Sequence, residues 1–230
     1  MVFEWQYNEF KQIGTDYNNI EEVRIYDERM GTLRNIEAEN KQIVEKILLS
    51  ANDKVLEIGC GTANFSIYAA KICKEVTALD ISKIMIEYAK GKAKKHNVSN
   101  IHFINAGFLT IDHSISDFDV AISGLALHHL PDFWKLIALK NIFNSLKPGG
   151  LFLLKDIVYS FEISNLENEV EKWVESAKDK NMKTSMQRHI RDEFSTTSWI
   201  MENLLITAGF HIQNKQYADS FFAEYVCVKN

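Results

Sequence analysis

Residues 55–64 read VLEIGCGTAN, the pattern of a strand that leads through a glycine turn into a helix. A short apolar run leads directly into Gly59 and Gly61, and a helical pattern begins at about Asn64. Glycine is needed where the backbone turns sharply between a strand and a helix and a ligand comes close, because a Cβ would obstruct the approach. The free N–H groups of the following helix would favour an anionic group there. The stretch therefore predicts a nucleotide-like ligand on a strand–helix junction, with a plain tight turn as the alternative.

Short apolar runs and helical patterns alternate on the C-terminal side of this junction. The runs that read as strands cover residues 53–59, 75–80, 101–106, 117–124 and 151–159. The helical patterns between them cover residues 64–73, 82–96 and 131–146. Ser82 suits the cap of the second helix and Pro131 the first turn of the third. Because the runs lack polar alternation, we expect strands buried on both faces of a parallel, doubly wound sheet.

The last part of the chain follows a different pattern. A helix is expected from about Ser195 to Thr207, capped by Ser195 or Thr196 and ended by Gly209. Two strands follow, at residues 210–217 and 221–229, with only a short link between them. A link that short requires an antiparallel hairpin, since a parallel return needs a long crossover.

The whole chain is predicted to be one domain in four parts. The parts are a helical preface at residues 1–50, a ligand-binding core at 51–160, a helical insertion at 161–194, and the last helix and hairpin at 195–230. Within the preface, helical spacing in residues 20–30 and 35–50 is interrupted near Gly31. The expected fold class is α/β, with a doubly wound, mostly parallel, seven-stranded sheet, an antiparallel C-terminal strand hairpin and an N-terminal helical cap.

Composition limits the classes of function. A formal net charge of −5 provides no excess of cations for phosphate backbones, so nucleic acid is not the expected partner. No apolar run reaches membrane-spanning length, and the N-terminus lacks the pattern of a signal peptide. Three separated cysteines fit neither a disulfide framework nor a CxxC metal site. We expect a cytoplasmic protein without membrane insertion or a metal, acting on a small molecule.

The residues around the glycines distinguish between two kinds of nucleotide ligand. Asp80 ends the second strand, where a carboxylate accepts hydrogen bonds from the two hydroxyls of a ribose. A dinucleotide fingerprint requires a third glycine at the position of Asn64. Glu57 would attract an ammonium group and repel a pyrophosphate. A ligand that carries an ammonium group is therefore favoured over a nicotinamide dinucleotide.

These motifs resemble those of class I, Rossmann-like S-adenosylmethionine-dependent methyltransferases. EIGCGTA at residues 57–63 is similar to their glycine-rich first motif, and ALD at 78–80 resembles the second. LKPGG at 146–150 looks like the turn before their fifth strand, and the terminal hairpin matches their reversed seventh strand. The resemblance implies S-adenosyl-L-methionine as the cofactor. It assigns cofactor binding to Glu57, Gly59, Cys60, Gly61, Asp80, Ile81, Ala106, Gly107, Phe108 and Ser123.

The chain departs from the family at the adenine end of the cofactor. Relatives often carry a Gly-Asp-Ala whose acid binds the adenine amino group, whereas the stretch here is Ala106-Gly107-Phe108. The resemblance then implies that backbone groups of Gly107 and Phe108 contact adenine, with ring contact from Phe108.

The acceptor side of the site is less determined by the sequence. ALHHL at residues 126–130 resembles small-molecule methyltransferases related to the ubiquinone/menaquinone C-methyltransferases. The candidate catalytic residues are His128, His129, His189, Arg191, Glu193 and Tyr159. His189, Arg191 and Glu193 would share one face of an extended segment. Structural histidines, a solvated loop before the last helix and a packed tyrosine are the alternatives.

Two other segments are candidates for enclosing the substrate. Gln12-Ile13-Gly14-Thr15-Asp16-Tyr17 is a polar turn that could close as a lid, and a helix at about 165–180 carries Val170 and Trp173, which face either a pocket or the core. The early aromatic residues, Phe3, Trp5, Tyr7 and Phe10, could hold an apolar substrate, pair with another subunit or dock on their own domain. A non-catalytic S-adenosylmethionine-binding regulator and a nicotinamide-dependent oxidoreductase remain the alternative functions.

Overall fold

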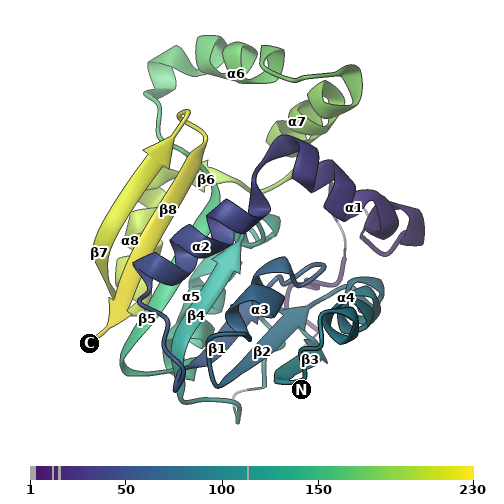
Figure 1. Cartoon of the computed structure of the whole chain (residues 1–230). Helices are drawn as coiled ribbons and strands as arrows, with labels where there is room; N and C mark the ends of the chain where they lie inside the picture. Colours follow the sequence, from purple (N-terminus) through teal and green to yellow (C-terminus); the bar gives the residue numbers. More distant parts are fainter. Residues whose placement is uncertain (1–3, 12, 15–16, 113) are drawn as a thin grey trace.

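A single sheet organises the computed structural model, which describes residues 4–11, 13–14, 17–112 and 114–230 (Figure 1). The strands are β1 (Lys54–Ile58), β2 (Glu75–Asp80), β3 (Ile101–Asn105), β4 (Phe118–Gly124), β5 (Leu146–Tyr159), β6 (Thr196–Thr197), β7 (Phe210–Ala218) and β8 (Phe222–Lys229). Seven lie in the order β3-β2-β1-β4-β5-β8-β7, and the two-residue β6 pairs with β5. Strands β1 to β5 are parallel, whereas β8 runs antiparallel to β5 and β7 antiparallel to β8. The predicted fold class is confirmed.

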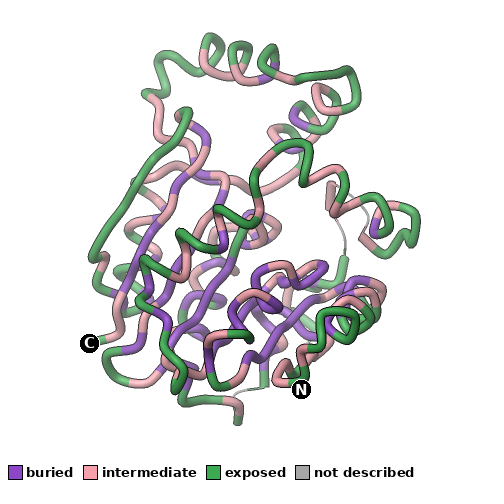
Figure 2. Tube along the Cα trace, in the orientation of Figure 1, coloured by how far each residue is buried: buried purple, intermediate pink, exposed green. Residues whose placement is uncertain are grey.

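Helices cover both faces of the sheet, as its apolar strands require. The helices are α1 (Ile20–Leu33), α2 (Ile36–Lys46), α3 (Asn64–Ala69), α4 (Lys83–Lys95), α5 (Asp132–Ser145), α6 (Leu166–Glu175), α7 (Lys180–Asp192) and α8 (Ser198–Ala208), with short 3₁₀ turns η1 (Leu127–His129) and η2 (Ile163–Asn165). In Figure 1, α2 and α3 lie on one face and α5 and α8 on the other. One apolar core forms between the sheet and α5 and α8, another lies beneath α2, α3 and α4, and a smaller cluster lies between α3 and α4. Figure 2 shows the central strands as mainly buried, while α1, α6 and α7 are largely exposed or intermediate.

Local signals set several boundaries as predicted. The Ser82 side chain accepts a hydrogen bond from the backbone N–H of Met85 at 3.1 Å and caps α4. Gly209 ends α8 at a φ of +112°, and a Cβ there would lie 2.8 Å from the Phe143 ring. Both reasons require glycine at this position.

Helix α8 begins later than expected, because the hydroxyl groups of both predicted capping residues are hydrogen-bonded to other side chains. Ser195 Oγ is bonded to the His189 ring at 2.8 Å, and Thr196 Oγ1 to Asp132 at 3.1 Å. The backbone at 196–197 pairs with β5 instead, and α8 begins at Ser198.

The predicted division of the preface into two helices is confirmed, but it lies at Arg34, a few residues beyond Gly31. Helix α1 continues through Gly31 to Leu33, because glycine costs a helix only about 1 kcal/mol. Helix α1 ends before Arg34. The Asn35 side chain caps α2 by accepting a hydrogen bond from the backbone N–H of Ala38 at 3.1 Å. The insertion contains two long helices where one was expected, because the Asp179 side chain caps a new one by accepting from Met182 N at 2.8 Å.

The described part of the N-terminal segment docks on its own domain. The Trp5 and Tyr7 rings each lie 6.3 Å from that of Trp134 on α5, measured between centroids, and Tyr7 also contacts Phe194 edge-on. Phe10 is 39% exposed, and Phe3 lies outside the described residues. Among the helices of the described chain, none combines the length and apolar character needed to cross a bilayer.

Candidate active site

A cavity opens at the carboxyl ends of the parallel strands, where ligands bind in open α/β sheets. About 730 Å³ of space lies within it, including its open mouth. The residues predicted to bind the cofactor that line it are Gly59, Gly61, Asp80, Ile81, Ala106, Gly107 and Phe108. We call it the adenosine cavity, after the part of the cofactor that the sequence places there.

The glycine loop after β1 turns as its sequence requires. Gly59 and Gly61 have φ angles of +78° and +52°, which side-chain-bearing residues rarely adopt. A Cβ on Gly59 would lie 2.4 Å from the Cβ of Ala126, so only glycine lets this loop meet the segment after β4. The loop thus forms one wall of the cavity without filling it.

Asp80 braces the same loop from the end of β2. Its two carboxylate oxygens accept from Gly61 N and Ser82 N, each at 2.8 Å, while Asn105 Nδ2 donates to the Asp80 carbonyl at 2.9 Å. Burial raises the pKa of Asp80. A carboxylate has about four lone-pair sites, so this one can still accept hydrogen bonds from ligand hydroxyls.

A second cavity continues on the other side of the glycine loop. This methionine cavity, as we call it, has about 700 Å³ of space and is lined by the other predicted residues, Glu57, Cys60 and Ser123. The Glu57 carboxyl accepts from Ser66 Oγ, and burial raises its pKa to about 7. Ser123 Oγ and Arg34 Nε are buried with no hydrogen-bond partner. Buried polar atoms that stay unpaired cost free energy. A ligand with an ammonium and a carboxylate group could pair with these atoms.

Several residues that line these cavities are not among those predicted from the sequence. Glu9 lines the adenosine cavity, and Tyr26 and Leu125 line both cavities. Tyr17, from the predicted lid segment, also lines the adenosine cavity. Of that segment, Gln12, Thr15 and Asp16 lie outside the described residues. No motif marks Glu9 or Tyr26, because they reach the site from the N-terminal segment and α1.

An open groove of about 2020 Å³ lies beside the two cavities, beneath α6 and α7. Its wall contains Trp173, stacked on Phe221 with 4.3 Å between ring centroids and an interplanar angle of 9°. Trp173 therefore faces this groove, which we call the acceptor groove, and the buried residue of α6 is Val174. Leu125 lines the groove and both cavities, so the three spaces meet at the end of β4.

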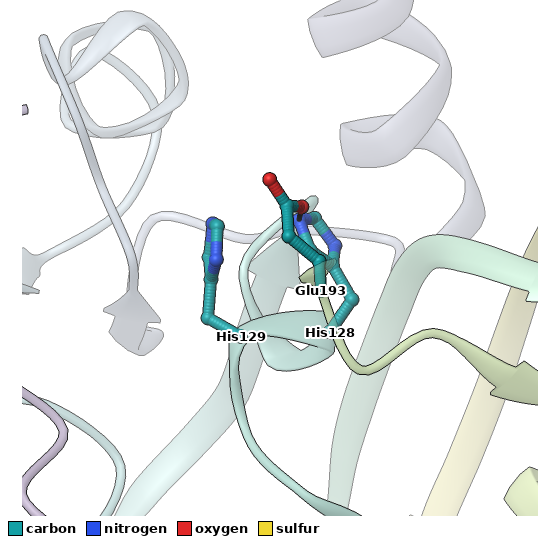
Figure 3. A group of neighbouring side chains, drawn as sticks. All are labelled: His128, His129 and Glu193. Atoms are coloured by element: carbon teal, nitrogen blue, oxygen red, sulfur yellow. Dashed lines mark ion pairs between the residues drawn. The ribbon is translucent and has the colours of Figure 1, made fainter. Parts of the chain in front are cut away.

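Four of the six candidate catalytic residues lie together at this meeting point. His128 Nδ1 is 2.5 Å from Asp156 Oδ1, and His128 Nε2 is 3.3 Å from Glu193 Oε2. His189 Nδ1 lies 2.5 Å from the same Glu193 oxygen. Figure 3 shows His128 and Glu193 close together with the ring of His129 beside them. We call His128, His129, His189 and Glu193 the histidine cluster. His129 lines the adenosine cavity and His189 lines the acceptor groove, so the cluster lies between the two spaces.

The surroundings of the two adjacent histidines, His128 and His129, shift their pKa values in opposite directions. Burial alone would lower the pKa of His128, but the carboxylates of Asp156 and Glu193 outweigh it and raise the pKa to about 9. Burial and the charge of His128 lower the pKa of His129 to about 4. Burial of Glu193 opposes its ionisation, yet hydrogen bonds from His128 and His189 hold its pKa well below the usual range. At neutral pH, His128 is charged and His129 is neutral.

Three candidate ligand atoms, from His128, His129 and Glu193, lie within 4.8 Å of one another, a spacing that a metal ion could use. The sequence predicts no metal. Both ring nitrogens of His128 already contact carboxylates, so ion pairs explain why these side chains lie close together.

The proposed extended segment through Arg191 is wrong. Residues 180–192 form α7, so His189 and Glu193, four apart, point the same way and Arg191 does not. The Arg191 side chain is 70% exposed and binds Asp192 at 2.7 Å. Tyr159 packs edge-on against Phe221, 5.6 Å between centroids, and does not line any of the three spaces among the described residues.

Comparisons with known proteins agree with this geometry. A family model described as "Methyltransferase domain" matches residues 49–222. A demethylmenaquinone methyltransferase of Staphylococcus haemolyticus is 29% identical over 147 residues, 63% of this chain and 57% of that protein. The chain thus spans little more than half the length of this curated relative.

Solved structures share the fold at low identity. An S-adenosylmethionine-dependent methyltransferase from Clostridium acetobutylicum matches with a TM-score of 0.70 at 15% identity, over 90% of this chain and 97% of the other. The N-methyltransferase NodS from Bradyrhizobium japonicum, solved with S-adenosyl-L-homocysteine, gives 0.60 at 20% identity, over 85% and 88%.

Proposed function

Because this chain belongs to the methyltransferase domain family, we propose that it transfers the methyl group of S-adenosylmethionine to a small-molecule acceptor. One observation carries the proposal: Leu125 lines the adenosine cavity, the methionine cavity and the acceptor groove. A non-catalytic regulator would need no opening onto the cofactor, whereas a transferase must bring acceptor and donor together.

The residues present fit S-adenosylmethionine. Asp80 would accept from the ribose hydroxyls, and the positive-φ glycines leave room for the ligand along the loop. Glu57 and the unpaired Ser123 Oγ suit the ammonium group, and the unpaired Arg34 Nε suits the carboxylate. These donor and acceptor types match an amino acid joined to a nucleoside better than they match a pyrophosphate, which Glu57 would repel.

The acceptor groove favours an apolar molecule with a flat ring. Trp173 and Phe221 present stacked aromatic surfaces, with Met182 and Met186 as adaptable apolar neighbours. The curated relatives are named for methylation of demethylmenaquinone, which makes a quinone-like ring the first acceptor to test.

When bound, S-adenosylmethionine supplies an electrophilic methyl group on a positively charged sulfur. The residues around Leu125 would align the acceptor with that methyl group and exclude water, and such alignment can supply about 7–11 kcal/mol. His129 is neutral at pH 7 and can accept a hydrogen bond from the acceptor, but with a pKa of about 4 it is a weak base. Charged His128 holds Glu193 and Asp156 in place. Catalysis here would therefore depend on positioning more than on proton removal.

Isothermal titration with S-adenosylhomocysteine tests the cofactor assignment. We expect binding on the order of micromolar, and a loss of about tenfold to a hundredfold in Asp80→Ala, because charged hydrogen bonds are lost. Glu87→Ala on α4, whose side chain is 71% exposed, is the control and should bind like wild type. NADH should not bind. Absence of S-adenosylhomocysteine binding to folded wild-type protein would refute the proposal.

A further inference from the structure

Glu9 is a buried carboxylate that reaches the adenosine cavity from the N-terminal segment. It is 6% exposed, and both of its oxygens lie 3.0 Å from Leu109 N, which donates to them. Thr110 Oγ1 donates to Glu9 Oε1 at 2.7 Å. The carboxylate is therefore held by the loop after β3, with Oε1 more heavily used than Oε2.

Gly107 makes room for this carboxylate. A Cβ on Gly107 would lie 2.4 Å from Glu9 Oε2 and 2.6 Å from Ile81 Cγ2. Gly107 has no positive φ, so its backbone conformation does not require glycine. What excludes a side chain at 107 is the space already taken by Glu9 and Ile81. The Glu9 oxygen thus lies where a side chain at 107 would begin.

This end of the cavity has the form of a site for a flat base. Asp80 marks the ribose position, and beyond it Ile81, Met85 and Phe108 provide apolar walls. Glu9 is the carboxylate among the described residues that lines the adenosine cavity together with Asp80. A hydrogen-bond acceptor at the edge of an apolar pocket suits a flat ring that carries an amino group at its own edge.

We propose that Glu9 Oε2 accepts a hydrogen bond from the 6-amino group of the adenine of the cofactor. The inference rests on the proposed function and adds a residue that selects the base. An ionised carboxylate only accepts hydrogen bonds, so it pairs with an amino group and opposes a carbonyl oxygen at the same position. Because the carboxylate is buried and fixed by the loop, a base that presents a carbonyl would set a second acceptor oxygen against Oε2, with no proton between them, which is costly.

A purely structural role for Glu9, as a tether of the N-terminal segment, makes a different prediction. A broken tether would weaken all ligands of the adenosine cavity alike. A recognition role changes the ratio of affinities between two ligands that differ only at the 6-position of the base. That ratio is the quantity to measure.

The experiment titrates the full-length protein with S-adenosylhomocysteine and with S-inosylhomocysteine, in which a carbonyl replaces the amino group. Wild type should prefer the adenosyl ligand by at least about tenfold. In Glu9→Ala we expect the preference to fall by at least about fivefold. In Glu9→Gln the side-chain oxygen keeps the bond from Leu109 N and the new amide N–H group faces the base, so the preference should be abolished or reversed. Glu4→Ala, an exposed acid of the same segment, should leave the ratio unchanged.

A second pair of variants tests the shared space. Gly107→Asp alone should bind S-adenosylhomocysteine poorly, because its side chain collides with Glu9. Glu9→Ala combined with Gly107→Asp should recover both affinity and base preference, since the new carboxylate occupies the same place. Circular dichroism establishes folding of each variant.

An unchanged ratio in folded Glu9→Ala and Glu9→Gln would overturn the assignment, as would equal binding of both ligands by wild type. Failure of wild type to bind S-adenosylhomocysteine at all would instead refute the proposed function, so the two failures are distinguishable.

Discussion

Glu57 and Asp80 are two buried carboxylates at the ends of neighbouring strands, and their surroundings differ. Burial raises the pKa of Asp80, and two backbone N–H groups that donate to it at 2.8 Å oppose this shift. Glu57 accepts from the hydroxyl of Ser66, and burial raises its pKa to about 7. Near neutral pH, Glu57 is thus poised between its two protonation states, and an ammonium group beside it would favour ionisation.

The affinity for S-adenosylhomocysteine should therefore depend on pH through Glu57. The ligand ammonium stabilises the charged carboxylate, so binding releases a proton and affinity rises with pH below 7, by at most about tenfold per unit, then levels off. In the free protein the sign is opposite: the raised pKa means that folding stability falls as pH rises from about 4.5 to 7. Titrations between pH 5.5 and 8.5 measure the first effect.

Glu57→Gln provides the control for this prediction. The amide preserves shape but cannot titrate, so the pH dependence should flatten. A wild-type affinity that stays constant between pH 5.5 and 7 would contradict the assignment of Glu57 to the ammonium end.

Among the elements, α6 and α7 give the acceptor groove its wall. Helix α6 places Trp173 against Phe221 of the β7–β8 link, and the end of α7 brings His189 and Glu193 to the 3₁₀ turn η1 (Leu127–His129). In Figure 1 both helices stand beyond the tips of β7 and β8, with α1 beside α7. The insertion therefore lines the acceptor groove, while the two cavities are lined by the loops of the sheet together with residues of the N-terminal segment and α1.

Trp173→Ala should raise the KM for the acceptor by about tenfold and leave the affinity for S-adenosylhomocysteine unchanged. The change removes aromatic surface from the acceptor groove, a loss of about 0.5–1.5 kcal/mol for the ring pair plus apolar area. Trp199→Ala is the matched control, because that side chain is 67% exposed on α8. A demethylmenaquinone serves as first acceptor in the steady-state assay. Equal loss of cofactor affinity would show that Trp173 acts on the whole fold instead.

At the scale of the whole molecule, distant segments meet at one end of the sheet. Tyr17 O accepts from Ser82 Oγ at 2.7 Å, and a Cβ on Gly14 would lie 1.9 Å from Glu193 Oε1. Lys178 Nζ donates to Thr32 O at 2.9 Å, which joins the insertion to α1. Because the ligand cavities lie between these segments, a ligand that fills them should stabilise the whole fold.

S-adenosylhomocysteine at a hundred times its Kd should stabilise the folded protein by about 2.7 kcal/mol. For a chain of this size that corresponds to a rise in Tm of roughly 5–10 °C. Differential scanning fluorimetry measures the shift, with NADH as the comparison ligand and Asp80→Ala as the variant in which the shift should disappear. A shift of the same size with NADH would contradict the choice of cofactor.

The parts of the site that could be predicted are those that local sequence encodes. Short apolar runs predicted β1 to β5 and the terminal hairpin, and Ser82 and Gly209 were placed correctly because caps depend on their own turn. Each of the ten predicted cofactor residues lines at least one of the two cavities, because the carboxyl ends of parallel strands necessarily meet at one edge. That these residues bind the cofactor stays a prediction.

The sheet, its reversed last strands and the glycine loop at residues 55–64 follow from local sequence, since strand periodicity and positive-φ turns are set within a few residues. The residues that face that loop are set by the packing of distant segments. Glu9 lies against Leu109 across a hundred residues, and Glu193 lies beside His128 because α7 packs over η1. Such contacts depend on how separate elements pack, and no spacing within one segment encodes them. For that reason Ala106-Gly107-Phe108 reads in sequence as a missing carboxylate, whereas in the fold Glu9 fills the space beside Gly107.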